Sequence, residues 1–210
     1  MLSVLEQDYP NMEYLIIDGA STDGTLNIIK KYADRVTFIS EPDKGIYDAM
    51  NKGLRMAKGE WVNFMNAGDA FADSHVLSDV FGEEIPKEIQ IIGEHIIKVF
   101  PNHTEIQYAE NPKVTVTKLP YCHQAVFIRI GTWHFDTSFS IAADYKVMYE
   151  CYWKYGEKSF MTLDRVVASY RMDDSTTFRN LKKVKGEYLR VQSMHRSWSW
   201  WKEYLKWRLL

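Results

Sequence analysis

Acidic residues recur in the first third of the chain wherever an apolar, strand-like segment ends. Asp18 ends the first such segment, Glu41 and Asp43 follow the second, and Asp69 follows the third. A lone acid at a strand end is usually a turn former or a helix cap. Acids at successive strand ends, however, gather carboxylates at the edge of a parallel sheet where ligands bind. Carboxylates beside a glycine-rich loop suit a phosphate ester that carries a metal ion.

One cation stands among these acids, in the stretch EPDKGIYDAMNKG. Lys44 and Gly45 come directly before a run of residues that form one apolar helix face. The residues of this face are Ile46, Ala49, Met50, Gly53 and Ala57. The functional interpretation is a turn that presents the Lys44 cation to such a phosphate ester. The alternative is an ordinary capped helix with a solvated lysine.

The segments that would position these residues alternate between strand-like and helix-like patterns. Strand-like segments run through residues 13–18, 35–40 and 60–65, and helix-like segments lie between them at 21–34 and 46–57. This β-α-β-α-β rhythm predicts an α/β fold of the Rossmann type, with a largely parallel sheet flanked by helices.

The second half of the chain is less regular. We expect residues 89–100 and 113–117 to extend the sheet, and further strands at 124–130 and 162–171. A helix is expected over residues 142–156, because the aromatic residues there recur at helical spacing.

Length, composition and charge limit the number of domains and the classes of partner. A chain of 210 residues with 46% hydrophobic content can bury one sizeable core. We therefore expect one domain over residues 1–172 and a C-terminal helical tail over 173–210. The formal net charge of -2 gives no electrostatic reason to expect nucleic-acid binding.

Cysteine usage and hydropathy indicate the compartment. Cys122 and Cys151 form no CxxC pair, so both are expected to be reduced packing residues in a reducing compartment. No apolar run approaches the roughly 20 residues of a membrane span, and the N-terminus does not resemble a signal peptide. We expect a cytoplasmic protein, with the inner face of the membrane as a candidate peripheral location.

Three segments carry a family resemblance: YPNMEYLIIDGASTDGTLNII, EPDKGIYDAMNKGLRMAKGEWVNFMNAGD and AADYKVM. In combination and in order they resemble glycosyltransferase family 2, over a region from about Ser3 to about Tyr170. The resemblance implies a GT-A fold and an inverting transfer of a sugar from a nucleotide-sugar, of the type used to build bacterial surface polysaccharides.

The resemblance assigns residues to the donor side. Asp18 matches an acid near the nucleotide base, and Asp43, Lys44 and Asp48 match the segment that closes on the nucleotide. Asn66, in the NAGD motif, is a further residue expected to bind the nucleotide-sugar.

The resemblance also assigns the metal and the acceptor side. Asp69 matches the last acid of the family's DxD-type motif, which holds Mg²⁺ or Mn²⁺ on the diphosphate. Asp144 matches the general base for the acceptor hydroxyl, and His123 and Gln124 match a pair that lines the acceptor side.

The sequence departs from the family pattern at three places. Gly19 and Gly68 stand where relatives often carry a second acid. Relatives begin with a strand and most of a helix before the segment that matches SVLEQDYPN, whereas here Met1 and Leu2 stand directly before Ser3. Without that strand, two buried strand edges would be unpaired, and each buried peptide group without a partner costs about 1–3 kcal/mol. We therefore expect that the sheet closes differently, that another segment or chain fills the slot, or that the natural protein starts further upstream.

The tail has its own pattern. At 100° per residue its aromatic and leucine residues form a broad apolar arc with lysines opposite. The arc consists of Trp198, Trp200, Trp201, Tyr204, Leu205, Trp207 and Leu209. Such a helix suits a membrane interface, or docking on the protein's own core or on a second subunit in a homodimer. Both alternatives remain open.

These observations favour a metal-dependent inverting glycosyltransferase that acts on a glycan or lipid-linked acceptor. One alternative is an inactive or partner-dependent nucleotide-sugar-binding module, because a strand is expected to be missing. A nucleotidyltransferase is less favoured, because the sequence shows no glycine-rich phosphate loop that carries Arg or Lys.

Overall fold

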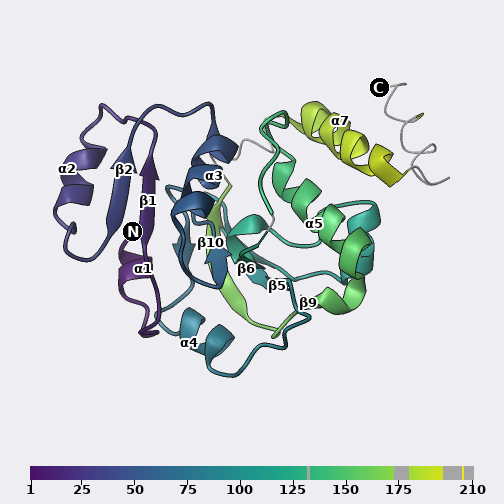
Figure 1. The fold of residues 1–210 in the computed structure, drawn as a ribbon, viewed down its shortest axis with the longest axis horizontal. Helices are drawn as coiled ribbons and strands as arrows, with labels where there is room; N and C mark the ends of the chain where they lie inside the picture. Colours follow the sequence, from purple (N-terminus) through teal and green to yellow (C-terminus); the bar gives the residue numbers. More distant parts are fainter. Residues whose placement is uncertain (132, 173–179, 196–204, 206–210) are drawn as a thin grey trace.

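The computed structural model describes residues 1–131, 133–172, 180–195 and 205 (Figure 1). The strands are β1 (Leu15–Asp18), β2 (Thr37–Ser40), β3 (Trp61–Asn63), β4 (Ala70–Phe71), β5 (Ile91–Gly93), β6 (His95–Val99), β7 (Thr104–Gln107), β8 (Val126–Arg129), β9 (Phe160–Met161) and β10 (Val166–Arg171). The α-helices are α1 (Leu2–Leu5), α2 (Thr25–Lys30), α3 (Ile46–Met56), α4 (Val76–Phe81), α5 (Ala143–Tyr155) and α7 (Leu181–Gln192). The 3-10 helices are η1 (Pro112–Val116), η2 (His123–Ala125), η3 (Glu157–Ser159) and η4 (Ser193–His195).

The fold is α/β with helices flanking the sheets, as predicted. Within the described part of the chain the strands form three sheets, in the orders β1-β2, β3-β8-β5-β9 and β4-β10-β6-β7. The pairs β1-β2, β5-β9 and β6-β10 are parallel, and the other pairs are antiparallel. The strand directions are therefore more mixed than the alternating pattern of the first half indicated.

The second half departs from expectation for local reasons. Residues 89–100 divide at Glu94 into two strands of different sheets, because the buried Glu94 carboxylate accepts the backbone N–H groups of Leu163 (2.6 Å) and Arg165 (3.3 Å). Residues 113–117 lie in and directly after the 3-10 helix η1 instead of a strand, since the Asn111 side chain caps its first turn at 2.9 Å.

No strand lies between β1 and β3 in the part of the chain that the structure describes. In the described residues β1 pairs only with β2, and β3 pairs only with β8. A cavity of about 790 Å³ is lined by both strands, including Leu15, Ile17 and Val62, by residues of α3, and by residues of α1 and α4. The cavity is therefore bounded by two strands with free edges and by helices, and its lining is mainly apolar.

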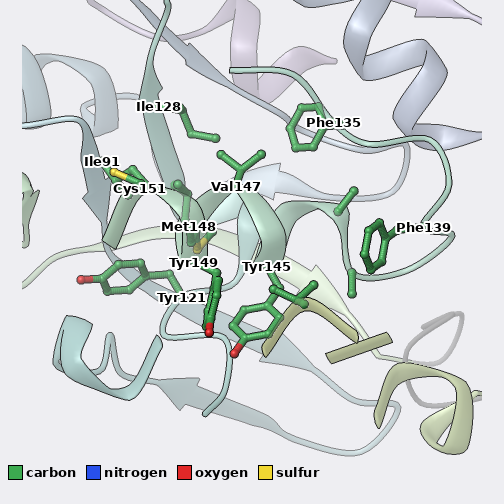
Figure 2. Close-up of a cluster of buried hydrophobic side chains, with 14 of the residues drawn as sticks. Ile91, Tyr121, Ile128, Phe135, Phe139, Tyr145, Val147, Met148, Tyr149 and Cys151 are labelled. Carbon is green, nitrogen blue, oxygen red and sulfur yellow. The ribbon is translucent and has the colours of Figure 1, made fainter. Parts of the chain in front are cut away.

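Helix α5 is the centre of the largest core (Figure 2). Tyr145, Met148 and Tyr149 point from α5 into this core, next to Tyr121 from the segment before η2 and Ile128 from β8. All are buried. This packing fixes the first turn of α5, which carries Asp144.

Helix α7 lies along α5 (Figure 1). The ring centroids of Tyr188 and Tyr145 are 4.4 Å apart, and the Glu187 carboxylate accepts the backbone N–H groups of Ile141 (2.9 Å) and Ala142 (3.0 Å) just before α5. The start of the predicted tail thus packs on the domain. Its aromatic arc lies outside the described residues except for Leu205, so the role of that arc stays a prediction.

Among the described residues, no helix combines the length and the hydropathy needed to cross a bilayer.

Candidate active site

Asp18 joins the ends of β1 and β2. Its buried carboxylate accepts the Ser40 hydroxyl at 2.6 Å and the Ser21 backbone N–H at 3.0 Å. Hydrogen bonding from Ser21, and next from Ser40, lowers the pKa of Asp18 below its usual value. Asp18 is therefore a charged group that ties the two strand ends together.

The loop before α3 is held by its own acids. Asp43 accepts the N–H of Gly45 at 2.8 Å, and Asp48 accepts the N–H of Lys44 at 3.0 Å. Gly45 has φ 116°, in the region that favours glycine. Lys52 on α3 reaches back to the Pro42 carbonyl at 2.8 Å. These contacts fix the loop and leave the Lys44 side chain exposed, where it can meet a ligand.

Asn66 and Asp69 lie on the tight turn after β3, where the N–H of Asp69 bonds to the Asn66 carbonyl at 3.1 Å. The Asp69 carboxylate accepts the Gln124 amide at 2.8 Å. The Cys122 thiol donates to the other end of that amide at 2.9 Å, which fixes its orientation. Burial raises the pKa of Asp69 above its usual value. Asp69 is thus a partly buried carboxylate that the Gln124 amide and the backbone of Arg171 hold in place.

Asp144 meets His123 and Tyr47 at the start of α5. The Asp144 Oδ1 atom accepts the Tyr47 hydroxyl at 3.2 Å and the N–H of Tyr145 at 2.8 Å. Its Oδ2 atom lies 3.4 Å from Nδ1 of His123. Asn66 Nδ2 lies 2.9 Å from Nε2 of His123. Because an amide nitrogen can only donate, Nε2 accepts, and neutral His123 carries its proton on Nδ1, toward Asp144.

The predicted residues fall into two groups. Asp18, Asp43, Lys44 and Asp48 lie at the β1 and β2 ends and around the start of α3. The second group, Asn66, Asp69, His123, Gln124 and Asp144, is joined through the consecutive residues His123 and Gln124. Helix α3 connects the groups, since its first turn contains both Asp48 and Tyr47.

Tyr47 is the site residue that the sequence analysis missed. It lies inside the motif DKGIYDAMNKG, but its hydroxyl partner is 97 positions away. The only sequence signal was a tyrosine next to an apolar helix face, which does not reveal such a partner.

The part of the chain that the structure describes contains no group of three or more His, Cys, Asp or Glu side chains placed to hold a metal ion. Asp69 fits a divalent cation as a single protein ligand: it is an oxygen donor, and no Lys or Arg side chain is paired with it in the described residues. The rest of the coordination shell would then come from the diphosphate and water.

Comparisons with known proteins agree with this architecture. A mycobacterial protein from Mycobacterium bovis, named as a PGL/p-HBAD biosynthesis glycosyltransferase, is 29% identical over 163 residues, which cover 71% of this chain and 62% of that protein. An Escherichia coli β-1,3-glucosyltransferase, WfaP, named for UDP-Glc and α-D-GlcNAc-diphosphoundecaprenol, is 30% identical over 132 residues, 59% of this chain and 50% of that protein. The chain therefore matches less than two thirds of the length of these relatives.

Solved structures show the same fold. Staphylococcus aureus TarS 1–349 in complex with UDP superposes with a TM-score of 0.67 at 18% identity, covering 92% of this chain and 59% of that one. The mannosyltransferase PcManGT from Pyrobaculum calidifontis, in complex with GDP-Man and Mn²⁺, has the same TM-score at 16% identity, covering 93% and 59%. These neighbours place the fold in the GT-A class. The family profile described as Glycosyl transferase family 2 matches residues 1–143, more than half of the chain. The chain belongs to glycosyl transferase family 2.

Proposed function

We propose that this chain carries the catalytic site of an inverting glycosyltransferase that moves a sugar from a nucleoside-diphosphate sugar to a hydroxyl of a glycan or lipid-linked acceptor. One observation carries the proposal. The neighbours His123 and Gln124 contact, respectively, the candidate base Asp144 and the candidate metal ligand Asp69. The groups needed at the two ends of a glycosyl transfer therefore belong to one connected network.

The proposed step is a single displacement. The acceptor oxygen forms a bond to the anomeric carbon on the face opposite the diphosphate, and the bond to the diphosphate oxygen breaks. Asp144 takes the hydroxyl proton, because its Oδ2 atom holds only the long contact to His123 while its Oδ1 atom already has two donors. Attack from the opposite face inverts the anomeric carbon.

On the donor side, Lys44 would meet the phosphates from its exposed loop, and Asp18 and Asn66 would contact the rest of the nucleotide-sugar. Asp69 would hold Mn²⁺ or Mg²⁺. A bound divalent cation neutralises charge on the leaving diphosphate. The Mn²⁺ in the PcManGT complex supports this assignment.

A second candidate function is favoured by the cavity between β1 and β3. Two free strand edges around an apolar cavity suit an additional β-strand, so the chain would bind nucleotide-sugar fully only when such a strand is supplied. Each buried peptide group without a partner costs about 1–3 kcal/mol. We propose that such a strand completes the donor pocket, because Asn66 lines the same cavity.

We also propose a cytoplasmic location, with peripheral contact to the inner face of the membrane. A lipid-linked acceptor would lie there, as the diphosphoundecaprenol in the name of the E. coli relative suggests. The aromatic C-terminal arc is the candidate contact, with homodimer formation as its alternative.

The test is an assay of hydrolysis and transfer across a panel of nucleotide-sugars, with and without Mn²⁺. It includes UDP and GDP sugars, because the neighbouring structures hold UDP and GDP-Man. Asp144→Asn is the decisive variant, with Asp136→Asn as its matched control, since Asp136 is paired with Lys146 at 3.7 Å. We expect Asp144→Asn to bind the donor but to lose about 10²–10⁴-fold in transfer. Transfer at the wild-type rate in Asp144→Asn would overturn the assignment.

A further inference from the structure

Tyr47 is buried, with 7% of its surface exposed, and its hydroxyl reaches Asp144 from a different helix. The two residues come from the first turns of α3 and α5. Tyr47 is not among the residues matched to the family pattern. Their proposed roles therefore do not explain why a phenol lies against the carboxylate proposed to take the proton.

The ring of Tyr47 is held in place by Phe135. It stacks on Phe135 with centroids 5.6 Å apart and an interplanar angle of 18°. One turn further along α3, the Asn51 amide binds both backbone groups of Phe135, at 2.7 and 2.8 Å. Because α3 and the Phe135 segment are pinned together, the Tyr47 hydroxyl has little freedom to leave Asp144.

The contact selects one oxygen of the carboxylate. Among the described residues, Oδ1 has donors from Tyr47 and from the N–H of Tyr145, whereas Oδ2 faces the Nδ1–H of His123, at 3.4 Å. Burial, and then the charge of Asp144, raises the pKa of Tyr47 far above its usual value, so its hydroxyl remains a donor. The lone pairs of Oδ2 are thereby left for an incoming hydroxyl.

The loop before α3, which we propose holds the donor, is attached to the same helix. Asp43 and Lys44 directly precede α3, and Asp48, next to Tyr47, binds the N–H of Lys44 at 3.0 Å. Asp48 therefore links this loop to its neighbour Tyr47 on the first turn of α3, so a displacement of the loop would reach Tyr47.

We propose that Tyr47 is a positioning residue that orients the Asp144 carboxylate for proton transfer and couples that orientation to the loop proposed to hold the donor. This inference rests on the proposed function, because it gives Asp144 the role of base. Tyr47 itself does not touch the reacting atoms.

In the described part of the chain, Tyr47 from α3 and His123 from η2 contact Asp144. Tyr188 from α7 and Cys122 from the segment before η2 lie near enough to interact with its charge. Burial raises the pKa of Cys122 to about 12 and that of Tyr188 well above its usual value, so both stay neutral at working pH. Neither group therefore adds a charge beside Asp144.

The test is Tyr47→Phe, measured in whichever preparation transfers sugar fastest, the chain alone or with an added strand. We expect kcat for transfer to fall about 10- to 100-fold, the magnitude of a hydrogen bond to a charged group, with KM for the donor changed less than about 3-fold. The acid limb of kcat/KM should move to higher pH by about one unit, because the carboxylate loses a donor that favours its charged form.

Tyr145→Phe is the matched control. It removes a hydroxyl of another buried tyrosine, which donates to the Thr115 carbonyl at 2.8 Å and accepts the Gln192 amide at 3.1 Å. It should leave the acid limb in place. If Tyr47→Phe does not fold, Phe135→Leu takes its place: it keeps the hydroxyl but removes the stacked ring, and a fall in kcat with a shifted limb is again expected.

The outcomes separate the two proposals. Loss of transfer in Asp144→Asn with an unchanged rate and pH profile in Tyr47→Phe would overturn the role of Tyr47 alone. Wild-type transfer in Asp144→Asn would overturn the proposed base, whatever Tyr47→Phe does.

Discussion

The backbone of Gly19 lies against the side chain of Asp43: a Cβ atom at Gly19 would stand 2.6 Å from Oδ2 of Asp43. Real Cβ atoms do not approach an oxygen so closely, so a side chain at this position must displace Asp43. The other oxygen of Asp43 holds the N–H of Gly45. Gly19, which stands where relatives often carry an acid, therefore leaves room for Asp43 and the loop before α3.

Gly19→Ala should weaken donor binding because it pushes Asp43 away from Gly45 and loosens the loop. We expect a loss of roughly 3- to 10-fold in donor affinity, about 1 kcal/mol, measured by calorimetric titration. Gly131→Ala is the control, because nothing lies within 4 Å of a Cβ there. Equal affinity in the two variants would contradict the role given to this contact.

Asp69→Asn should abolish the gain in donor affinity that Mn²⁺ provides, because an amide is a poorer ligand for a hard cation than a carboxylate. Titrations of wild type and variant, each with and without Mn²⁺, measure that gain directly. Asp73→Asn is a suitable control, since Asp73 is paired with Arg165 at 2.8 Å. A Mn²⁺ effect of wild-type size in Asp69→Asn would refute the metal assignment.

Asp18 should make stability depend on pH in the acid range. Its pKa is lowered in the folded state by hydrogen bonds from Ser21 and Ser40. The contribution of Asp18 to the free energy of unfolding is therefore complete above its unfolded pKa of about 3.9. It is lost as the pH falls through the lower pKa of the folded state.

Asp18→Asn tests this dependence through the free energy of unfolding between pH 7 and pH 2.5. The variant should be less stable than wild type by about 1–3 kcal/mol at pH 7, with the difference shrinking below about pH 4. Asp34→Asn, at an exposed position near β2, should show no such trend. A constant difference at all pH values would contradict the mechanism.

An apolar strand supplied to the cavity between β1 and β3 should stabilise the chain. A peptide attached before Met1, or added separately, would pair with both free edges and fill the cavity. We expect the unfolding midpoint to rise by at least about 4 °C, and the β1 and β3 amides to exchange more slowly with deuterium. The same peptide with a central proline is the control; an equal effect of both would argue against strand insertion.

The first half of the fold was readable because its signals are local. Asp18 ends a continuous apolar run, and Lys44-Gly45 precedes an apolar helix face, so the types of these elements followed from neighbouring residues. Asp18 is the last residue of β1, Glu41 and Asp43 follow β2, and Asp69 lies on the turn after β3. The helix that carries Asp144 spans Ala143–Tyr155, close to the predicted range.

The parts of the fold and of the site that were not predicted depend on contacts between segments far apart in the sequence. Glu94 divides what looks like one strand, because its carboxylate binds backbone groups about seventy residues further on. Asn111 turns a β-branched stretch into a 3-10 helix. The contact of Tyr47 with Asp144 joins the first turns of two helices, and no local pattern encodes it.

The free edges of β1 and β3 also bear on how the protein behaves at high concentration. Unpaired strand edges recruit strands of other molecules, which leads to exchanged segments or to aggregation. For this chain, self-association would compete with any strand that completes the sheet, so concentration controls which of the two occupies the cavity. Dilute solution is therefore the condition under which the proposed nucleotide-sugar chemistry of the chain is best measured.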